Sequence, residues 1–353
     1  DPLWSRGLGD VYKRQEKKKL IGFQTMPFGE SPSRARKVVK KGSILVSTVR
    51  PNLNAIAVLE NDTPNISVAS TGFCILDCKD DVDNRFVFNF CKSRKFIDDM
   101  VSKATGASYP AVSDKIIRSA LVPNYTYEEQ CNISKVLDSI SDIIDKREAE
   151  LFSLDELIKA RFVEMFGCIH DGRFDMKTLL EIVNDDKNSI KRGPFGGALK
   201  KEDFVEDGYL VYEQRHAIHN DFEYAKYYIN QEKYEDMIGF KVIPGDLIIS
   251  CSGVTLGRIA EVPEGAKEGI INQALLKLSL NPHIMMNTFF IQQFRGEEIQ
   301  NILFGFSRGS GIPNMPSMSE VKAVKFICPP LELQKEYCDF VHQVDKSKFM
   351  KSF

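Results

Sequence analysis

The sequence SYPAVSDKIIRSALVP, residues 108–123, is echoed about 200 residues later by NMPSMSEVKAVKFICPP, residues 314–330. In both stretches a proline precedes a serine that is followed by an acidic residue, with Ser113 as the serine in the first and Ser319 in the second. A lysine, an apolar run typical of a strand and a closing proline come next. A repeat of this kind predicts one structural unit that the chain uses twice.

The likeness extends upstream of these stretches. Three further pairs of segments match: a glycine turn that leads into a strand, a second strand, and an amphipathic helix with aromatic residues at helical spacing. They are KKGSILVSTVRPN (40–52) with IPGDLIISCSGVT (243–255), STGFCILDC (70–78) with INQALLKLS (271–279), and residues 86–106 with residues 286–306. The predicted fold class is therefore α+β, with two similar α/β domains.

A long helix is predicted after each repeat. Between Glu128 and Phe166 apolar residues recur in steps of three and four, the period of a coiled-coil seam, and Gly167 ends the helix. The same pattern begins again after Pro330 and stops at Phe353, so we expect the shorter helix to pack against the longer one. The predicted helix-pairing residues are Ile133, Leu137, Ile140, Ile144, Leu151, Leu154, Ile158, Leu333, Tyr337, Phe340 and Val344.

Composition places the chain among globular proteins. With 353 residues, 43% hydrophobic and 27% charged, it is long enough for two domains that each bury a core. Its eight cysteines form no CxxC pair, so we expect buried thiols in a reducing cytoplasm rather than structural zinc. No apolar run is long enough to predict a membrane span or a secretory segment, and a cytoplasmic location without a membrane partner is expected.

Together these residues resemble the specificity subunits of type I restriction-modification enzymes, over residues 20–353. The likeness rests on the Gly-Ser and Gly-Asp turns at 42–43 and 245–246, and on the Ser-acid segment that closes at Pro329-Pro330. It rests most of all on the long helix, which matches the family's central spacer in its E-Q-x-x-I-x-x-x-L-D opening, its D-x-x-I-x-x-R core and its F-x-E-M-F-G close.

The resemblance implies a DNA-recognition subunit that is not an enzyme and needs no cofactor. Each target recognition domain would read one half of a split site on double-stranded DNA, and the helices would pair antiparallel to set the gap. The helices would also dock two methyltransferase subunits, which methylate N6 of adenine, and through them restriction subunits that translocate and cut DNA. A helix of 40 residues is about 60 Å long, which is between one and two DNA turns of about 34 to 36 Å.

Domain boundaries follow from the same alignment of the two halves. The opening segment MKTLLEIVNDDKNSIKRGPFGGALKKEDF of the second domain has no match in the first, so we expect truncation at both ends. Residues 1–15 look like translated sequencing adapter and are set aside. The remaining expectation is a first recognition domain at 16–125, a central spacer helix at 126–167, a second recognition domain at 173–330 and a truncated distal spacer helix at 331–353.

Two basic runs are candidates for phosphate contact. RARKVVKK (34–41) supplies Arg34, Arg36 and Lys37, and KNSIKRGPFGGALKK (187–201) supplies Lys191 and Arg192. Either run can instead be a solvated surface without a ligand. YEQRHAIH (212–219) concentrates side chains that read bases, because glutamine pairs with adenine and arginine with guanine. We predict base contacts for Gln214, Arg215 and His216, and the alternative is a strand end with polar side chains.

Loops supply the remaining candidates for DNA contact. In the second half they are Ser252 and Arg258 in SCSGVTLGRIA (250–260) and Arg308 in SRGSG (307–311), although Gly253 and Gly257 also fit plain hairpin turns. The corresponding positions in the first half are Arg50, Asn52, Thr105 and Tyr109.

Catalytic motifs are missing from the sequence. The Pro-Pro pair stands in Cys-Pro-Pro-Leu, not in the Asp/Asn-Pro-Pro-aromatic motif of an N6-adenine methyltransferase, and no GxxxxGK[ST] occurs. His216 and His219 lack an HExxH context, so no metal site is expected. Two alternatives to a specificity subunit stay open. One is the recognition portion of a single-chain restriction-methyltransferase with a missing upstream catalytic domain, and the other is a structural coiled-coil scaffold that binds no DNA.

Overall fold

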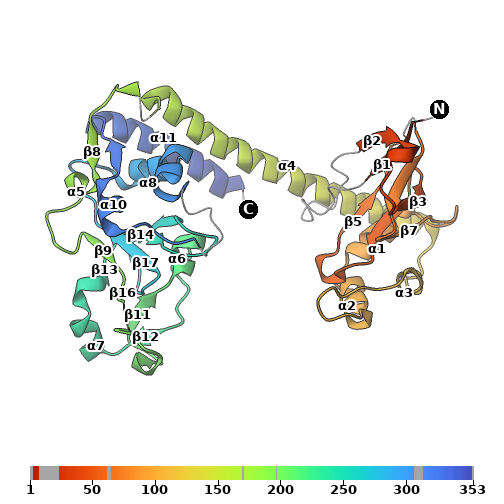
Figure 1. Cartoon of the computed structure of the whole chain (residues 1–353), viewed down its shortest axis with the longest axis horizontal. Helices are drawn as coiled ribbons and strands as arrows, with labels where there is room; N and C mark the ends of the chain where they lie inside the picture. Colours follow the sequence, from red (N-terminus) through yellow and green to blue (C-terminus); the bar gives the residue numbers. More distant parts are fainter. Residues whose placement is uncertain are drawn as a thin grey trace. The chain divides into compact units, whose positions relative to one another are not determined.

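The computed structural model of the chain describes residues 3–7, 24–61, 65–168, 171–195, 197–305 and 313–351 (Figure 1). It divides into two compact units, unit 1 at Asp1–Lys146 and unit 2 at Arg147–Phe353. The division falls inside the helix α4, Tyr127–Phe166, in the middle of the expected central spacer.

Unit 1 is built around a short antiparallel sheet with the strand order β5-β4-β7. The central strand β4, Ile44–Ser47, is buried on both faces, because Ile44 and Val46 pack on helices while Leu45 packs on a second layer. The elements are β5 Ile56–Val58, β7 Phe73–Leu76, the pair β3 Ala35–Val39 and β6 Ser67–Ser70, η2 Phe28–Glu30, η3 Pro51–Leu53, α1 Asn84–Lys92, α2 Arg94–Lys103 and α3 Asp114–Arg118.

A strand also forms from the segment that we set aside as adapter. Residues Leu3–Gly7 form β1, which pairs antiparallel with β2, Gln24–Pro27. This pairing is an element that the sequence did not lead us to expect.

Unit 2 contains a four-stranded antiparallel sheet with the order β15-β14-β17-β9 and a five-stranded sheet with the order β10-β12-β11-β16-β13. The first sheet consists of β15 Ile259–Glu261, β14 Leu247–Ser250, β17 Leu275–Leu278 and β9 Ile190–Arg192. The second consists of β10 Phe204–Val205, β12 Tyr228–Ile229, β11 Tyr209–Tyr212, β16 Gly269–Ile271 and β13 Lys241–Val242. A further pair joins β8 Met176–Thr178 to β18 Lys325–Ile327.

Helices cover the four-stranded sheet and complete the main core of unit 2 (Figure 1). They are α5 Leu179–Ile182, α8 Asn287–Arg295, α9 Glu297–Phe304, α10 Met318–Ala323 and α11 Leu331–Lys351, together with the end of α4. The helices α6 Gln214–His219 and α7 Gln231–Asp236 belong to smaller clusters, and the 3-10 turns are η5 Lys201–Asp203 and η6 Ile238–Phe240. The expected α+β fold class is confirmed.

The two units share one topology, which confirms the repeat. Equivalent elements occur in the same order and about 200 residues apart. The pairs are β3 with β13, β4 with β14, β5 with β15, β6 with β16, β7 with β17, α1 with α8, α2 with α9, α3 with α10 and α4 with α11. Unit 2 has additional strands, namely β10, β11 and β12 beside β16 and the pair β8–β18. It also has β9, which pairs with β17, whereas no described strand occupies that place beside β7 in unit 1.

The single amphipathic helix that we expected in each unit was wrong in both, and for the same reason. Each segment predicted as one amphipathic helix is two helices, broken at Ser93 between α1 and α2 and at Gly296 between α8 and α9. The Ser93 side chain accepts a hydrogen bond from Phe96 N and so caps a new helix. Apolar periodicity continues across the break, which is why the pattern alone did not reveal it.

The Ser-acid segment of the opening repeat begins a helical turn and not a strand. Ser113 caps α3 by accepting from Ile116 N, and its equivalent is Ser317, which accepts from Glu320 N. Ser319, the serine that the sequence suggested, lies inside α10. The expected strand follows only in unit 2, as β18, because Leu121 in unit 1 is 88% exposed and has no core to face.

A buried glutamine attaches each long helix to its unit. Gln130 near the start of α4 accepts from Asp83 N at 3.0 Å and donates to Tyr125 O at 2.8 Å. Gln334 near the start of α11 accepts from Met286 N at 2.9 Å and donates to Ile284 O and Pro329 O. The glutamine of the E-Q opening therefore attaches the long helix in unit 1, and Gln334 does the same in unit 2.

The long helices pair antiparallel within unit 2. The Tyr337 hydroxyl donates to Ile158 O at 3.2 Å, and Lys348 forms an ion pair with Asp155 at 2.7 Å. The helices α4 and α11 therefore run in opposite directions (Figure 1). One hydrophobic cluster takes in the predicted residues Leu154, Ile158, Leu333, Tyr337, Phe340 and Val344.

The earlier part of the predicted seam lies differently. Leu151 and Ile133 are half-buried, whereas Leu137, Ile140 and Ile144 in unit 1 are 39%, 49% and 52% exposed. No described helix of unit 1 covers these three side chains.

Candidate nucleic-acid interface

Four of the predicted DNA-contacting residues of unit 1 lie together where β4 ends. Arg50 and Asn52 belong to the loop between β4 and β5, and isolated bridges join Val49 and Thr105 to Ala111. The Arg50 guanidinium lies 4.8 Å from the centre of the Tyr109 ring. We call Arg50, Asn52, Thr105 and Tyr109 loop surface 1; all four are exposed.

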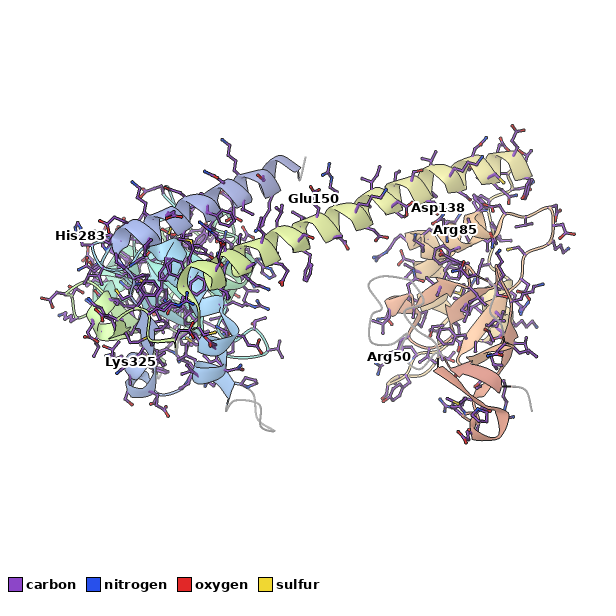
Figure 2. The ribbon with its side chains drawn as sticks, turned by 90° about the horizontal axis from the view of Figure 1, so that it is seen from above. Arg50, Arg85, Asp138, Glu150, His283 and Lys325 are labelled. Atoms are coloured by element: carbon purple, nitrogen blue, oxygen red, sulfur yellow. The ribbon has the colours of Figure 1, made fainter. Side chains whose placement is uncertain are left out.

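Loop surface 1 and the contact with α4 lie at opposite ends of β4. Gly42, just before the strand, accepts a hydrogen bond from Asn84 at the start of α1. Arg85, the next residue, forms a two-pronged ion pair with Asp138 of α4, at 2.8 and 2.9 Å. Figure 2 shows Arg85 and Asp138 side by side and Arg50 well away from both.

The basic run of unit 1 is divided by the structure. Arg34 and Arg36 are exposed, and Arg34 O accepts from Thr71 N in the β6–β7 turn, at the strand end that carries loop surface 1. Lys37 instead forms an ion pair with Asp114 and donates to Phe73 O, both at 2.7 Å. Its charge is therefore neutralised within the unit, and we assign it a structural role in place of the expected phosphate contact.

Unit 2 brings four segments together at the equivalent strand end. Gln214 Nε2, at the start of α6, donates to Ser252 Oγ at 2.7 Å, and Ser252 is bridged to Asn314. Arg192, at the end of β9, donates to Asn314 Oδ1 at 3.4 Å. We call Arg192, Gln214, Ser252 and Asn314 loop surface 2. It carries amide and guanidinium groups of the kind that read base edges.

Arg192 is the most constrained member of loop surface 2. Its guanidinium lies 5.5 Å from the ring of Phe195, which is 68% exposed. Its Nε is buried and has no hydrogen-bond partner among the described residues. Lys191 turns the other way and lies 4.8 Å from the Phe240 ring.

Other predicted residues of unit 2 do not join loop surface 2. His216 is fully buried, with Nδ1 accepting from Glu213 N and Nε2 at 2.9 Å from Tyr224 O, so it has a structural role and not the expected base contact. Arg215 forms an ion pair with Asp221 at 3.4 Å and lies 4.5 Å from the Tyr224 ring. Arg258 is exposed after the β14–β15 loop, and Arg308 lies outside the described residues.

Asn314 and Phe195 are the members of this region that we did not predict. Asn314 opens the second copy of the repeated stretch, where its equivalent in unit 1 is Ala111. The sequence offered no signal for Asn314, because the equivalence with Ala111 rests on bridges that only the structure shows.

The described residues contain no group of three or more side chains that could hold a metal ion. Burial raises the pKa of the Cys91 and Cys251 thiols to about 12, which keeps both protonated at neutral pH. Across the same part of the chain, every helix is too short or too polar to cross a lipid bilayer.

Comparison with known families finds a similarity in unit 2. Residues 194–351 match the model of the type I restriction modification DNA specificity domain. These residues contain Gln214, Ser252 and Asn314. This part of unit 2 is therefore similar to a type I DNA specificity domain. The family description names recognition of DNA and not a chemical step.

Solved structures extend the fold of the specificity domain to nearly the whole chain. A chain from a structure described as "Structural basis underlying complex assembly and conformational transition of the type I R-M system" is 19% identical, with a TM-score of 0.54, and the match covers 99% of this chain and 86% of that one. The type I restriction-modification system S subunit from M. genitalium is 15% identical, with a TM-score of 0.51 and coverage of 90% and 79%. Among proteins with curated descriptions, the comparison found no significant match.

Proposed function

We propose that this chain is a specificity subunit that recognises a two-part target on double-stranded DNA and docks methyltransferase subunits, and through them restriction subunits. One observation carries the proposal. Units 1 and 2 share a common set of elements in the same order, and each gathers polar side chains at the same strand end. Those of loop surface 1 are exposed and those of loop surface 2 are exposed or half-buried, and most of loop surface 2 lies in the segment that matches a DNA specificity domain.

Side-chain chemistry supports different tasks within each loop surface. Arginine, glutamine and asparagine in loop surfaces 1 and 2 have the donors and acceptors that distinguish bases in the major groove. Arg34 and Arg36 fit phosphate contacts, which position a protein on DNA without reading sequence. Two similar surfaces on one chain suit a target with two separated parts.

Features at the end of each unit away from its loop surface support partner docking. The exposed side chains Leu137, Ile140 and Ile144 form an apolar stripe on the part of α4 in unit 1. Cavities of about 220 and 870 Å³ occur beside the equivalent glycines Gly42 and Gly245. Features repeated in both units suit two copies of one partner, as the resemblance to the family implies for methyltransferase subunits.

Selection from a random duplex library tests DNA recognition. The full chain should enrich duplexes with two separated conserved parts, and Gln214→Ala should lose discrimination at one base pair by about 1 to 3 kcal/mol. Gln343→Ala, an exposed change on α11, is the matched control. Equal enrichment of all sequences by the wild-type chain would contradict the proposal.

Co-purification with the methyltransferase subunit tests docking. Ile144→Asp places a charge on the exposed stripe and should weaken the complex while the circular dichroism spectrum stays unchanged, because Ile144 is 52% exposed. Glu148→Ala, also exposed on α4, should leave the complex intact. A complex that tolerates Ile144→Asp would show that the stripe is not used.

A further inference from the structure

Arg50 occupies a backbone conformation that residues with a side chain rarely adopt. Its φ is 51° and its ψ is 62°, in the left-handed region, where Cβ crowds the following carbonyl group. Pro51 follows it, and a proline favours extended backbone in the residue before it. Strain of this kind persists where the surrounding structure holds it and often marks a functional residue.

Unit 2 shows what the fold alone requires at this position. The equivalent of Arg50 is Gly253, with a φ of 79°. Both backbone N–H groups donate to the carbonyl group of an equivalent proline, Pro110 at 2.7 Å and Pro313 at 2.8 Å. Because the two loops are hydrogen-bonded alike, the left-handed conformation belongs to the loop, and glycine adopts it without strain. Unit 1 has an arginine at that position.

The side chain of Arg50 is arranged for an external partner. Its guanidinium lies over Tyr109, which is 68% exposed, and no carboxylate among the described residues pairs with it. Arg85 and Arg215, by contrast, are bound to Asp138 and Asp221. Stacking on a ring covers the face of a guanidinium and leaves its edge free to donate two parallel hydrogen bonds.

We propose that Arg50 is a specificity-determining residue that reads a guanine in the half-site addressed by unit 1, with Tyr109 as its positioning residue. Bidentate donation from arginine to O6 and N7 of guanine matches the free edge described above. Asn52 and Thr105 lie beside it and contribute to the same surface. The inference rests on the proposed function, since it assumes that loop surface 1 meets duplex DNA.

The test compares Arg50→Gly with the wild type in the full chain, by selection from a random duplex library and by thermal melting. The variant should lose its preference for one guanine in one half-site and bind the wild-type target about 10-fold or more weakly. Its Tm should not fall, because relief of the left-handed strain offsets the greater freedom of glycine in the unfolded chain.

Three further variants separate reading from other roles. Arg50→Lys keeps the charge but not the planar fork, so it should lose the guanine preference while non-specific binding at low salt persists. Tyr109→Ala should weaken the same preference, and Tyr109→Phe should restore it. Arg36→Ala, an exposed arginine of the same unit, should weaken binding to all duplexes equally.

Two outcomes overturn the inference while leaving the proposed function in place. In one, Arg50→Gly keeps every base preference of the wild type. In the other, it weakens binding to all duplexes equally, which indicates a phosphate contact. A lower Tm with unchanged selectivity would assign Arg50 to the loop's stability. A wild-type chain that selects no sequence would instead remove the proposed function itself.

Discussion

Units 1 and 2 preserve the same contacts with different residues. In unit 1 the Ser43 hydroxyl, in the turn before β4, donates to Asp77 Oδ1 at 2.6 Å after β7. In unit 2 the residues are exchanged, and the Ser279 hydroxyl donates to Asp246 Oδ1 at 2.5 Å. The comparison teaches that this fold conserves a hydrogen bond between two positions and not the residue at either one.

Other contacts are kept with identical residues. Asn84 donates to Gly42 O and Asn287 to Gly245 O, and Gln130 and Gln334 attach the long helices in equivalent ways. The two glutamines satisfy several backbone groups at once, which only an amide side chain can do here. At the exchanged position Ser43 and Asp246 each accept one backbone N–H, from Lys40 and Ile243, a task that a hydroxyl or a carboxylate can perform. The loop surfaces differ most, since each is expected to meet its own DNA sequence.

The largest expected effect comes from removing a helix-docking glutamine. Gln334→Ala should destabilise unit 2 by about 2 to 4 kcal/mol, because it removes hydrogen bonds to three backbone groups that are buried or partly buried. Gln130→Ala should cost unit 1 less, since Gln130 makes two such bonds. Hydrogen exchange in α8 and α1 measures both. If both substitutions lowered stability equally, the number of hydrogen bonds made by each glutamine would not determine its contribution.

Exchanging the Ser–Asp pair of unit 1 probes the interchangeability of its two positions. Ser43→Asp alone should cost about 2 to 3 kcal/mol, because it places two carboxylates together at a buried position. Adding Asp77→Ser recreates the arrangement of unit 2 and should recover most of the loss. A double variant no more stable than Ser43→Asp would show that the surroundings, and not the pair, fix the order.

The ion pair between α1 and α4 predicts a dependence on pH that the equivalent contact of unit 2 does not share. Partial burial raises the pKa of Asp138, but hydrogen bonds from Arg85 and Asn89 outweigh it and hold the pKa below its usual value. A lowered pKa in the folded state stabilises unit 1 above the ordinary Asp value of about 3.9, and this stabilisation is lost as the pH falls through the folded value.

Asp138→Asn should therefore lower the stability of unit 1 at neutral pH by about 1 to 2 kcal/mol and make it less sensitive to acid. In unit 2 the equivalent pair is Thr288 and His342, which lie 3.3 Å apart and contain no carboxylate. Acid titration followed by hydrogen exchange in α1 provides the measurement. An unchanged acid dependence would place the titrating group elsewhere.

The smallest expected effect concerns the helix break. Gly296 begins α9 without a side-chain cap, whereas Ser93 caps α2 at the equivalent position. Gly296→Ser should stabilise unit 2 by a few tenths of a kcal/mol, provided that Gln293 O, 3.0 Å from the added Cβ, shifts slightly. Thermal melting decides the sign, and a fall in Tm would mean that Gln293 O cannot move.

The sequence predicted those features that depend on local pattern. The seam from Glu128 to Phe166 predicted α4 to within one residue of its start, and Gly167 ends it with a φ of 70°. Strands β4 and β14 lie where the repeat placed them, because both are apolar runs after a glycine turn.

The sequence failed where tertiary contacts decide the outcome. His216 looked like a base-reading residue because it stands beside Gln214 and Arg215, but Tyr212, Phe222 and Tyr224 surround its ring and bury it. Lys37 belongs to a basic run, yet Asp114 neutralises it from 77 positions away. Asn314 joins loop surface 2 through a bridge to Ser252 that no local pattern encodes.

The strand β4 is four residues long. The loop that carries Arg50 follows one end of it, and the contacts with α1 lie at the other end. Changes in the Arg50 loop leave the Gly42, Asn84 and Asp138 contacts untouched, because these lie at the other end of the strand (Figure 2). Substitutions in the loop can therefore accumulate while the contacts that hold α1 and α4 persist, because the buried strand separates the two.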